Sequence, residues 1–258
     1  MKPILVFPYH DPQKKFNYYL KKNIGTLKEL FSEILVSATF PTTKGNPEGL
    51  GILEKNGCIL FKNNENTQIG DHFRNGLKLF LDNSKNELAY FGFIDRILFI
   101  LESKHRDSFI KDVSGETSKD IVVFARSKKA WSTHPKDYYL IEKILNDAGK
   151  ILFNQDIDWV WCGTKLNKET AKLIQEESIA KDFSIIPEFV LISVLNNLKL
   201  ENKEVDWQEW EEPFWQKVQN KKIIRDLPKK EKMFRLNYVN NSINLFLNRE
   251  TNSCVDLR

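Results

Sequence analysis

Short apolar runs alternate with amphipathic segments through the first hundred residues of the chain. Residues 3–9 form a continuous apolar run, which is typical of a strand buried on both faces. Apolar side chains then recur at helical spacing over residues 15–31. The alternation of strand and helix patterns continues at residues 33–40, 46–56, 58–65, 68–83 and 87–95. Strands that alternate with helices predict an α/β fold with a mostly parallel central sheet flanked by helices.

The pattern is less regular in the second half of the chain. We expect a strand with a basic loop, then a helix, then a strand, turn and helix, at residues 120–131, 136–152 and 158–178. Another helix at 186–200 precedes a late strand and the Trp-rich stretch "EVDWQEWEEPFW". From Gln216 onward the chain is charged and Asn-rich. The sequence therefore predicts one domain over residues 1–215 and a C-terminal extension, 216–258, that packs on it or trails from it.

Polar residues follow several of the predicted strands. His10 and Asp11 come after the first strand, and residues 39–43 and 63–65 come after the second and third. Asp95 stands at the end of the fourth strand. Since ligands of open α/β sheets bind beyond the carboxyl ends of the strands, these positions are the first candidates for a binding site.

Composition excludes several classes of protein. The chain has 39 basic and 35 acidic residues with the signs well mixed, which argues against a nucleic-acid-binding protein. No window approaches the length of apolar sequence that spans a membrane, and the N-terminal apolar stretch is too short for a signal peptide. Three cysteines, Cys58, Cys162 and Cys254, without CxxC spacing argue against a disulfide scaffold or a zinc site. We expect a cytoplasmic globular protein.

Four short segments stand in a recognisable order. They are a glycine-bounded helix start, an aspartate after a strand, a small-residue turn before a helix, and an acidic residue near a later helix: Gly70-Arg74-Asn75-Gly76, Phe93-Ile94-Asp95, residues 162–174, and Glu188 or Asp182. In this order the chain resembles the nucleotide-diphospho-sugar transferases of the GT-A fold class. The glycine at 76 stands one place early relative to the usual Gly-x-x-x-Arg-Asn-x-Gly segment.

The resemblance covers residues 3–210 and implies a single GT-A-like, Rossmann-like domain that binds a nucleotide sugar donor and an unknown acceptor. The Asp95-Arg96 pair and an "RSxxAWxTHP" segment resemble a poorly characterised bacterial branch of this superfamily. By the same resemblance, the residues that contact the nucleotide sugar are His10, Asp11, Gly70, Arg74, Asp95, Arg96 and Arg126.

The resemblance also implies a Mg²⁺ or Mn²⁺ ion that neutralises the departing pyrophosphate, with Asp95 as its ligand. The partner carboxylate of the usual Asp-x-Asp motif is replaced by Phe93, which cannot bind a metal. Three outcomes remain open. Asp95 alone holds the ion with water and phosphate, a cation such as Arg74, Arg96 or Arg126 replaces it, or catalysis is lost.

An inverting transferase needs a base near the acceptor hydroxyl, and Glu188 or Asp182 is the candidate. Ordinary structural roles are the alternatives for most of these residues. Asp95 and Glu188 suit the first turn of a helix, Arg74 suits a solvated helix face, and Asp11 before Pro12 suits a turn.

Two functions follow from these observations. The first is a glycosyltransferase that moves a sugar from a nucleotide-diphospho-sugar donor to an unknown acceptor. The second is a binding protein that keeps the GT-A-like fold and has lost catalysis, for which Phe93 is the main support. The tryptophan-rich cluster could stack on a sugar ring, or could simply belong to the core: Trp207, Trp210, Phe214 and Trp215.

Overall fold

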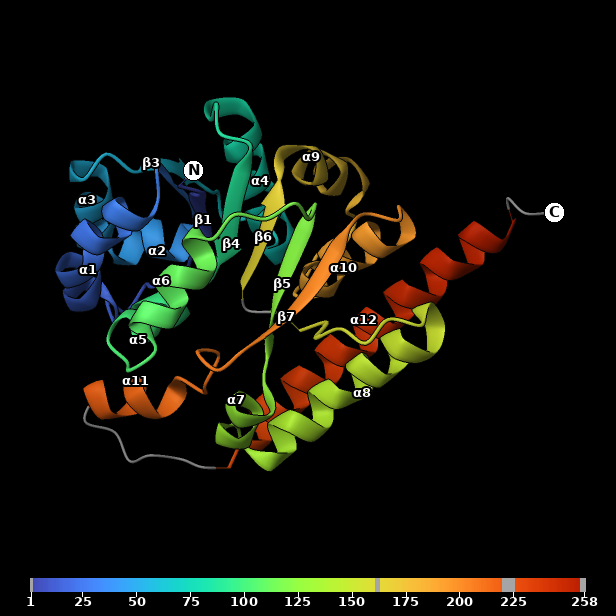
Figure 1. The fold of residues 1–258 in the computed structure, drawn as a ribbon. Coiled ribbons are helices and arrows are strands. Elements are labelled where there is room, and N and C mark those ends of the chain that lie inside the picture. The colour runs from blue at the N-terminus through green and yellow to red at the C-terminus, as the bar shows by residue number, and fades with distance from the viewer. Residues whose placement is uncertain (1, 161–162, 220–225, 256–258) are drawn as a thin grey trace.

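The computed structural model describes residues 2–160, 163–219 and 226–255 (Figure 1). Cys162, which opens the turn expected from the resemblance, lies outside the described residues. In the described part of the chain, no helix is long and apolar enough to cross a membrane.

A seven-stranded sheet forms the centre of the molecule, in the order β3-β2-β1-β4-β6-β5-β7 (Figure 1). The strands are β1 (Ile4–Tyr9), β2 (Ile34–Ala38), β3 (Ile59–Lys62), β4 (Leu88–Gly92), β5 (Ile121–Arg126), β6 (Gly163–Asn167) and β7 (Leu200–Val205). β1 pairs in parallel with both β2 and β4, and β7 runs parallel to β5. The predicted α/β fold with a mostly parallel sheet is confirmed.

β6 is the exception, because it runs antiparallel to both β4 and β5. The small-residue turn predicted in this segment was wrong, since residues 163–167 form the strand itself. The helix predicted after the turn is present, as α9 (Lys168–Glu177). Their polar side chains disguise a buried strand: Thr164 donates a hydrogen bond to the Val122 carbonyl oxygen at 2.9 Å. The strand predicted to end at Asp95 also ends earlier, at Gly92.

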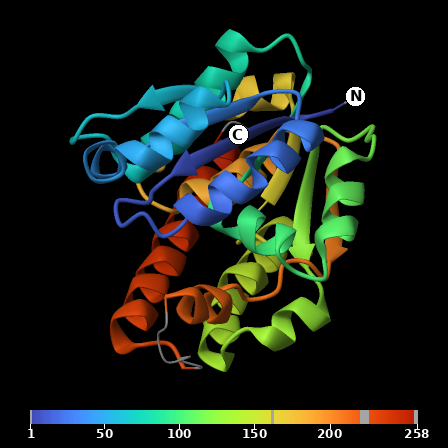
Figure 2. The ribbon, with the colours of Figure 1, turned by 90° about the vertical axis from the view of Figure 1, so that its left-hand side faces the viewer.

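Helices cover both faces of the sheet. They are α1 (Asn17–Leu30), α2 (Phe40–Gly45), α3 (Pro47–Lys55), α4 (Ile69–Asn83), α5 (Ile94–Leu101), α6 (Arg106–Ser114), α7 (Lys128–Thr133), α8 (Lys136–Phe153), α9 (Lys168–Glu177), α10 (Ile185–Leu195), α11 (Glu212–Val218) and α12 (Lys229–Val255). One core lies under α1, α3, α5, α6 and α11, and Figure 2 views the molecule from this side. The other core lies under α4, α8, α9, α10 and α12.

Side chains of the central strands alternate between these two cores. In β1, Ile4 and Val6 belong to the core of α4, whereas Leu5, Phe7 and Tyr9 belong to the core of α1. This is the two-residue period of a strand buried on both faces.

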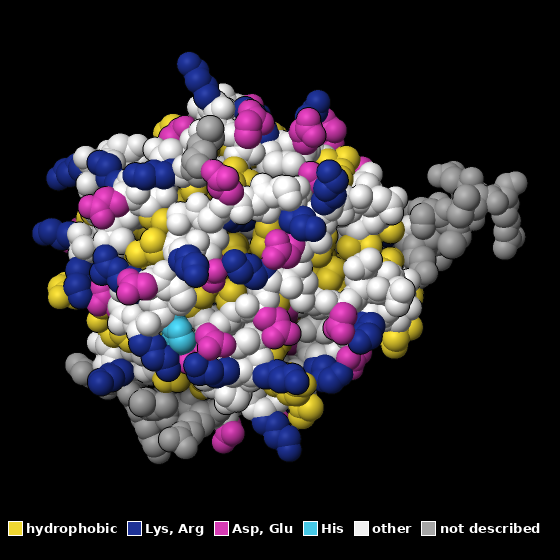
Figure 3. Space-filling model, viewed as in Figure 1, with side chains coloured by type: hydrophobic (Ala, Val, Ile, Leu, Met, Phe, Trp, Pro, Cys, Tyr) yellow, Lys and Arg dark blue, Asp and Glu magenta, His cyan; other side chains and the backbone are white. Residues whose placement is uncertain are grey.

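The C-terminal helix α12 lies along α8 (Figure 1). Four of its side chains, Tyr238, Val239, Leu245 and Phe246, are buried in the same core as α4 and α10. The extension beyond Gln216 therefore contributes to the core of the sheet domain. On the face shown in Figure 3, Lys and Arg side chains are interspersed with Asp and Glu, without a basic stripe.

Candidate functional site

A cavity of about 610 Å³ lies beyond the carboxyl ends of β1, β2 and β4. β1 stands between β2 and β4 in the sheet, so this is the point where the strand order reverses. The cavity is lined by Pro8, His10, Phe16, Thr39, Phe40, Pro41, Asn64, Glu65, Thr67, Ile69, His72, Phe73, Phe93, Ile94, Asp95 and Phe183. Of the predicted binding residues, His10 and Asp95 therefore line one cavity.

Asp95 enters the cavity from the first turn of α5, two residues beyond the N-cap position at Phe93. Burial raises the pKa of the Asp95 carboxyl, while the Arg96 guanidinium and the backbone N–H groups of Asp95 and Arg96 act in the opposite direction. Asp95 therefore lies in the first turn of a helix, as its structural alternative predicts, and it also lines the cavity. Phe93, in the place of the first motif aspartate, packs edge-on against Phe73 with ring centroids 5.8 Å apart.

Two histidines line the same cavity. His10 Nδ1 lies 2.9 Å from the Thr39 hydroxyl, which fixes the ring at the end of β1. His72, on α4, is only 8% exposed, and its Nδ1 has no hydrogen-bond partner among the residues described. Burial lowers the pKa of His72; the Asp71 carboxylate acts against this, and His10 adds to it. Sequence reasoning missed His72, because it lies inside a helical pattern with no motif of its own.

Asp11 is buried and organises the loop after β1. Its carboxylate accepts hydrogen bonds from the backbone N–H groups of Lys15 and Phe16, at 2.7 and 3.0 Å. It also accepts one from the Asn46 amide at 3.2 Å. The hydrogen bond to Phe16 N–H holds Phe16 at the cavity wall. Asp11 therefore positions a lining residue and does not itself line the cavity.

Gly70 and Arg74 converge on the segment 178–184. Gly70 N–H donates to the Lys181 carbonyl oxygen at 3.1 Å. Arg74 binds the Asp71 carboxylate at 2.6 Å and the Ala180 carbonyl oxygen at 2.9 Å. A Cβ at Gly70 would lie 2.0 Å from the same Ala180 oxygen, so only glycine fits this contact.

Glu188 and Asp182 hold the other side of this segment. The fully buried Glu188 carboxylate accepts hydrogen bonds from the backbone N–H groups of Ile179 and Ala180, at 2.9 and 3.0 Å. The Asp182 carboxylate accepts from Ser184 N–H at 2.8 Å. Neither residue is among those that line the cavity, but Phe183 of the same segment is. Their predicted role as catalytic base stays untested; their visible role is to position Phe183.

Arg126 lies at the end of β5, in a buried cluster apart from the cavity lining. Its guanidinium makes two hydrogen bonds to Asp158, at 2.6 and 2.7 Å, and one to Glu142 at 2.6 Å. Trp131 covers it at 3.6 Å from the ring centroid. His134 is buried nearby, and its pKa falls to about 2, chiefly through burial and then through the Arg126 charge. In this arrangement Arg126 ties β5 to α8 and the segment before β6.

Arg96 is buried beside Asp95 and turns away toward the loop after β7. It donates to the Glu209 carbonyl oxygen at 2.9 Å and pairs with the Glu211 carboxylate at 2.7 Å. Burial raises the pKa of Glu211 to about 7; the Arg96 charge opposes this shift, and the Asp95 charge adds to it. Sequence reasoning missed Glu211, although the acidic pair within "WEEPFW" was a visible signal.

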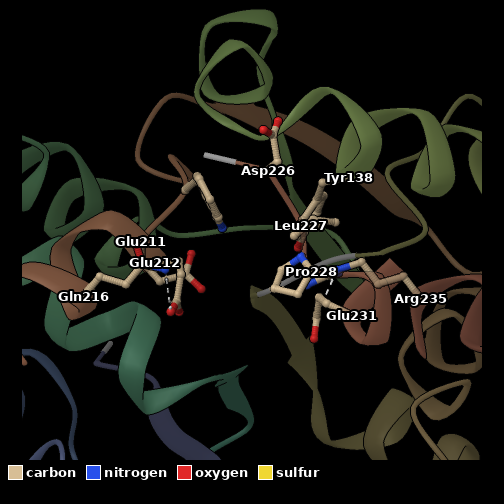
Figure 4. Close-up of a pocket in the computed structure, with 10 residues that line it drawn as sticks. Tyr138, Glu211, Glu212, Gln216, Asp226, Leu227, Pro228, Glu231 and Arg235 are labelled. Carbon is tan, nitrogen blue, oxygen red and sulfur yellow. Dashed lines mark hydrogen bonds and ion pairs between the residues drawn. The ribbon is translucent and has the colours of Figure 1, made fainter. Parts of the chain in front are cut away.

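Glu211 also lines a second cavity of about 380 Å³. In Figure 4, Glu211, Glu212 and Gln216 lie on one side of this cavity, and Glu231 and Arg235 lie on the other. Asp95, Arg96 and Glu211 thus connect the wall of the first cavity to that of the second. The described lining of the second cavity also includes Tyr138, Trp210, Asp226, Leu227 and Pro228.

Most of the aromatic cluster near residue 210 is core. Trp207 is 2% exposed, packs against Phe109 and Phe124, and donates its indole N–H to Asp112 at 2.9 Å. Trp215 packs on Phe16 with centroids 4.9 Å apart. Phe214 is half-buried and packs against Tyr19, Phe99 and Trp215. Trp210 lines the second cavity, so the sugar-stacking alternative stays open for it.

The residues around Asp95 do not fit a metal held by two carboxylates. Phe93 supplies no ligand, and its ring is packed against Phe73. Across the described ranges of the chain, no group of three or more His, Cys, Asp or Glu side chains is arranged to hold a metal ion. A divalent cation here would have Asp95 as its one carboxylate of the motif.

No protein-family model matches the chain, and no curated protein matches its sequence. Solved structures of glucosyl-3-phosphoglycerate synthase from Mycobacterium tuberculosis match its fold. The complex with Mn²⁺, UDP-glucose and phosphoglyceric acid aligns at a TM-score of 0.59 and 11% identity, over 97% of this chain and 80% of that chain. The complex with Mn²⁺, UDP-glucose and glycerol 3-phosphate aligns at 0.57 and 11%, over 96% and 80%.

A third complex of the same enzyme, with Mn²⁺, UDP and glucosyl-3-phosphoglycerate, aligns at a TM-score of 0.52 and 10% identity, over 79% of this chain and 70% of that chain. Identities this low speak for the fold and not for the substrate. The order of the strands, the single antiparallel β6 and these alignments agree. The chain has the GT-A fold, the architecture of nucleotide-sugar glycosyltransferases.

Proposed function

We propose that this protein is a glycosyltransferase that binds a nucleotide-diphospho-sugar in the cavity beyond β1, β2 and β4 and transfers the sugar to an acceptor hydroxyl. One observation carries the proposal: a GT-A fold with a 610 Å³ cavity at the point where the strand order reverses. The cavity lining includes the Asp95 carboxylate and the His10 imidazole, which we place against the donor. A cytoplasmic location, expected from the cysteines, is part of the same proposal.

The site residues fall into two groups in this proposal. His10, His72 and Asp95 contact the donor, because they line the cavity. Asp11, Gly70, Arg74, Asp182 and Glu188 act through the backbone segments that carry Phe16 and Phe183.

Glu211, which lines the second cavity and not the donor cavity, is a further candidate for the base beside Glu188 and Asp182. It is bonded to Arg96 at 2.7 Å, and the neighbouring Asp95 lines the donor cavity. A base with a pKa of about 7 can accept a proton from an acceptor hydroxyl near neutral pH. The hydroxyl oxygen then bonds to the anomeric carbon, and the bond from that carbon to the phosphate oxygen breaks.

A second function is favoured by one observation. Phe93 is packed in the cavity wall where the resemblance places a metal-binding carboxylate. If no other group replaces the metal, the protein binds a nucleotide sugar without cleaving it.

Purified protein is screened by thermal shift against UDP-, GDP-, CMP- and dTDP-sugars, because a ligand that binds only the native state raises the melting temperature. The stabilising donor is then incubated with the protein and release of its nucleotide is measured. The proposed transferase releases nucleotide, Asp95→Asn abolishes the release, and Asp82→Asn on the exposed part of α4 leaves it unchanged. Binding without release supports the second function. No stabilisation by any donor refutes both.

A further inference from the structure

We propose that the donor cavity recognises the uncharged nucleoside part of its ligand without a divalent cation, and that His72 makes the polar contact. The inference rests on the proposed function for the class of ligand. It departs from the metal-dependent binding that the resemblance implies, and it follows from the chemistry of the cavity wall.

The wall is mainly aromatic and apolar. Phe16, Phe40, Phe93 and Phe183 reach it from four separate segments of the chain. The rest of the apolar lining is Pro8, Pro41, Ile69, Phe73 and Ile94. Aromatic faces bind nucleobases by stacking, with little dependence on which base is present. A surface of this kind suits a planar ring, and the polar groups beside it, such as Thr39, Asn64 and Thr67, bring no positive charge to a phosphate.

The charged groups on the wall have the wrong sign for a diphosphate. Among the described residues that line the cavity there is no lysine or arginine, whereas two carboxylates, Glu65 and Asp95, are present. Two negative groups repel a diphosphate in a partly buried site, and an uncharged nucleoside meets no such opposition. The usual remedy, a metal held between the two motif carboxylates and the phosphates, lacks the first motif carboxylate because Phe93 stands in its place.

His72 points to a ligand more directly. The side chain is 8% exposed, it lines the cavity, and its Nδ1 lacks a hydrogen-bond partner in the described part of the chain. Buried polar atoms are nearly always bonded, so the His72 imidazole has hydrogen-bonding capacity that no described residue takes up. Burial keeps the ring neutral by lowering its pKa, against the opposing Asp71 carboxylate and with the help of His10. A neutral imidazole offers one donor and one acceptor, as base edges and ribose hydroxyls require.

The experiment is isothermal titration of the whole protein with uridine, cytidine, guanosine and thymidine, and with the matching diphosphates, each in EDTA and in Mn²⁺. We expect one nucleoside to bind within about ten-fold of its diphosphate, and Mn²⁺ to change either affinity by less than about three-fold, since the base and ribose supply most of the contact. Diphosphate binding that requires Mn²⁺, with no nucleoside binding, overturns the inference and leaves the proposed transferase intact.

Two variants distinguish a hydrogen bond from His72 to the ligand from a purely structural role of His72. His72→Phe should weaken the nucleoside by about ten-fold or more, since the hydrogen bond is lost, and His72→Asn should recover much of it through its amide. Equal affinity in the two variants overturns the role of His72. If His72→Phe does not fold, the Asn variant and the metal comparison still decide.

Phe93→Asp completes the Asp-x-Asp motif and should make diphosphate binding respond to Mn²⁺, whereas we expect no such response from the native chain. Metal dependence in the native protein equal to that of this variant overturns the inference. Nucleoside binding without any nucleotide release from a donor keeps the inference and refutes the transferase. No binding by any nucleoside or diphosphate refutes both.

Discussion

Gly70 is the position where the fold allows the least change near the donor cavity. A Cβ atom there would lie 2.0 Å from the Ala180 carbonyl oxygen and 2.9 Å from its carbon. Ordinary contact begins at 3.4 Å, so Gly70→Ala requires the start of α4 and the segment 178–184 to separate by about 1.4 Å. Two groups resist this movement: the Gly70 N–H bond to Lys181, and the Glu188 carboxylate that holds Ile179 and Ala180.

Overpacking of a well-ordered contact costs about 1–3 kcal/mol. For a chain of this size each kcal/mol lowers the melting temperature by roughly 2–4 °C, so we expect Gly70→Ala to melt about 2–12 °C lower. Because Phe183 of the same segment lines the cavity, nucleoside affinity should fall as well. Circular dichroism melts and isothermal titration measure the two effects.

Gly25 provides the matched control. It lies on an exposed face of α1, and a Cβ there meets nothing within 4 Å. Gly25→Ala should therefore stabilise the protein by about 0.5–1 kcal/mol, the usual gain for alanine over glycine in a helix. A Gly70→Ala protein as stable as the native one would show that this contact is not formed as described.

Three further predictions concern charges inside the protein. Arg126→Met leaves Asp158 without its cation, and we expect a loss of about 3–5 kcal/mol in denaturant unfolding; a folded variant that loses only ligand affinity would contradict the structural role. Lys165→Met removes the donor to three backbone carbonyls at the C-terminal end of α6, with an expected loss of about 2–3 kcal/mol; unchanged stability would show that water replaces it. Glu211 has a folded pKa of about 7, above its ordinary 4.5, so the folded state holds the extra proton and stability falls as pH rises from 4.5 to 7, by roughly 3 kcal/mol. Glu211→Gln should flatten that slope in urea titrations, and parallel pH curves for the two proteins would refute the buried carboxylate.

The strands and most helices of the first half could be predicted from the sequence because each has a hydrophobic pattern of its own. Apolar runs such as residues 4–9 are buried on both faces, and the helices between them show one apolar side. β6 could not be read in this way. Lys165 is 3% exposed at the centre of that strand, because its ammonium donates to carbonyls on α6 rather than to water. A lysine in a buried strand contradicts the pattern on which strand prediction depends.

The C-terminal helix was missed for a different reason. Residues 229–255 are charged and Asn-rich, yet Tyr238, Val239, Leu245 and Phe246 recur at helical spacing and are buried against α8 and α10. The period was present in the sequence, but the composition hid it. These four apolar side chains are buried because α8 and α10 supply the surfaces against which they pack.

The residues that carry the resemblance fall into two groups: those that hold the backbone of the fold and the one that would bind a metal. Gly70, Arg74 and Glu188 all bind the segment 178–184, from opposite sides and largely through its backbone. These contacts do not depend on which ligand occupies the cavity. They fix the position of Phe183 in the cavity wall and do not contact the ligand itself. Position 93, where the usual motif has a metal-binding carboxylate, is different. Its side chain does not hold the backbone of another segment, and phenylalanine there packs against Phe73. If the proposed function holds, the sequence keeps the frame of the cavity and changes the one motif position, Phe93, at which a metal would meet the phosphate charge.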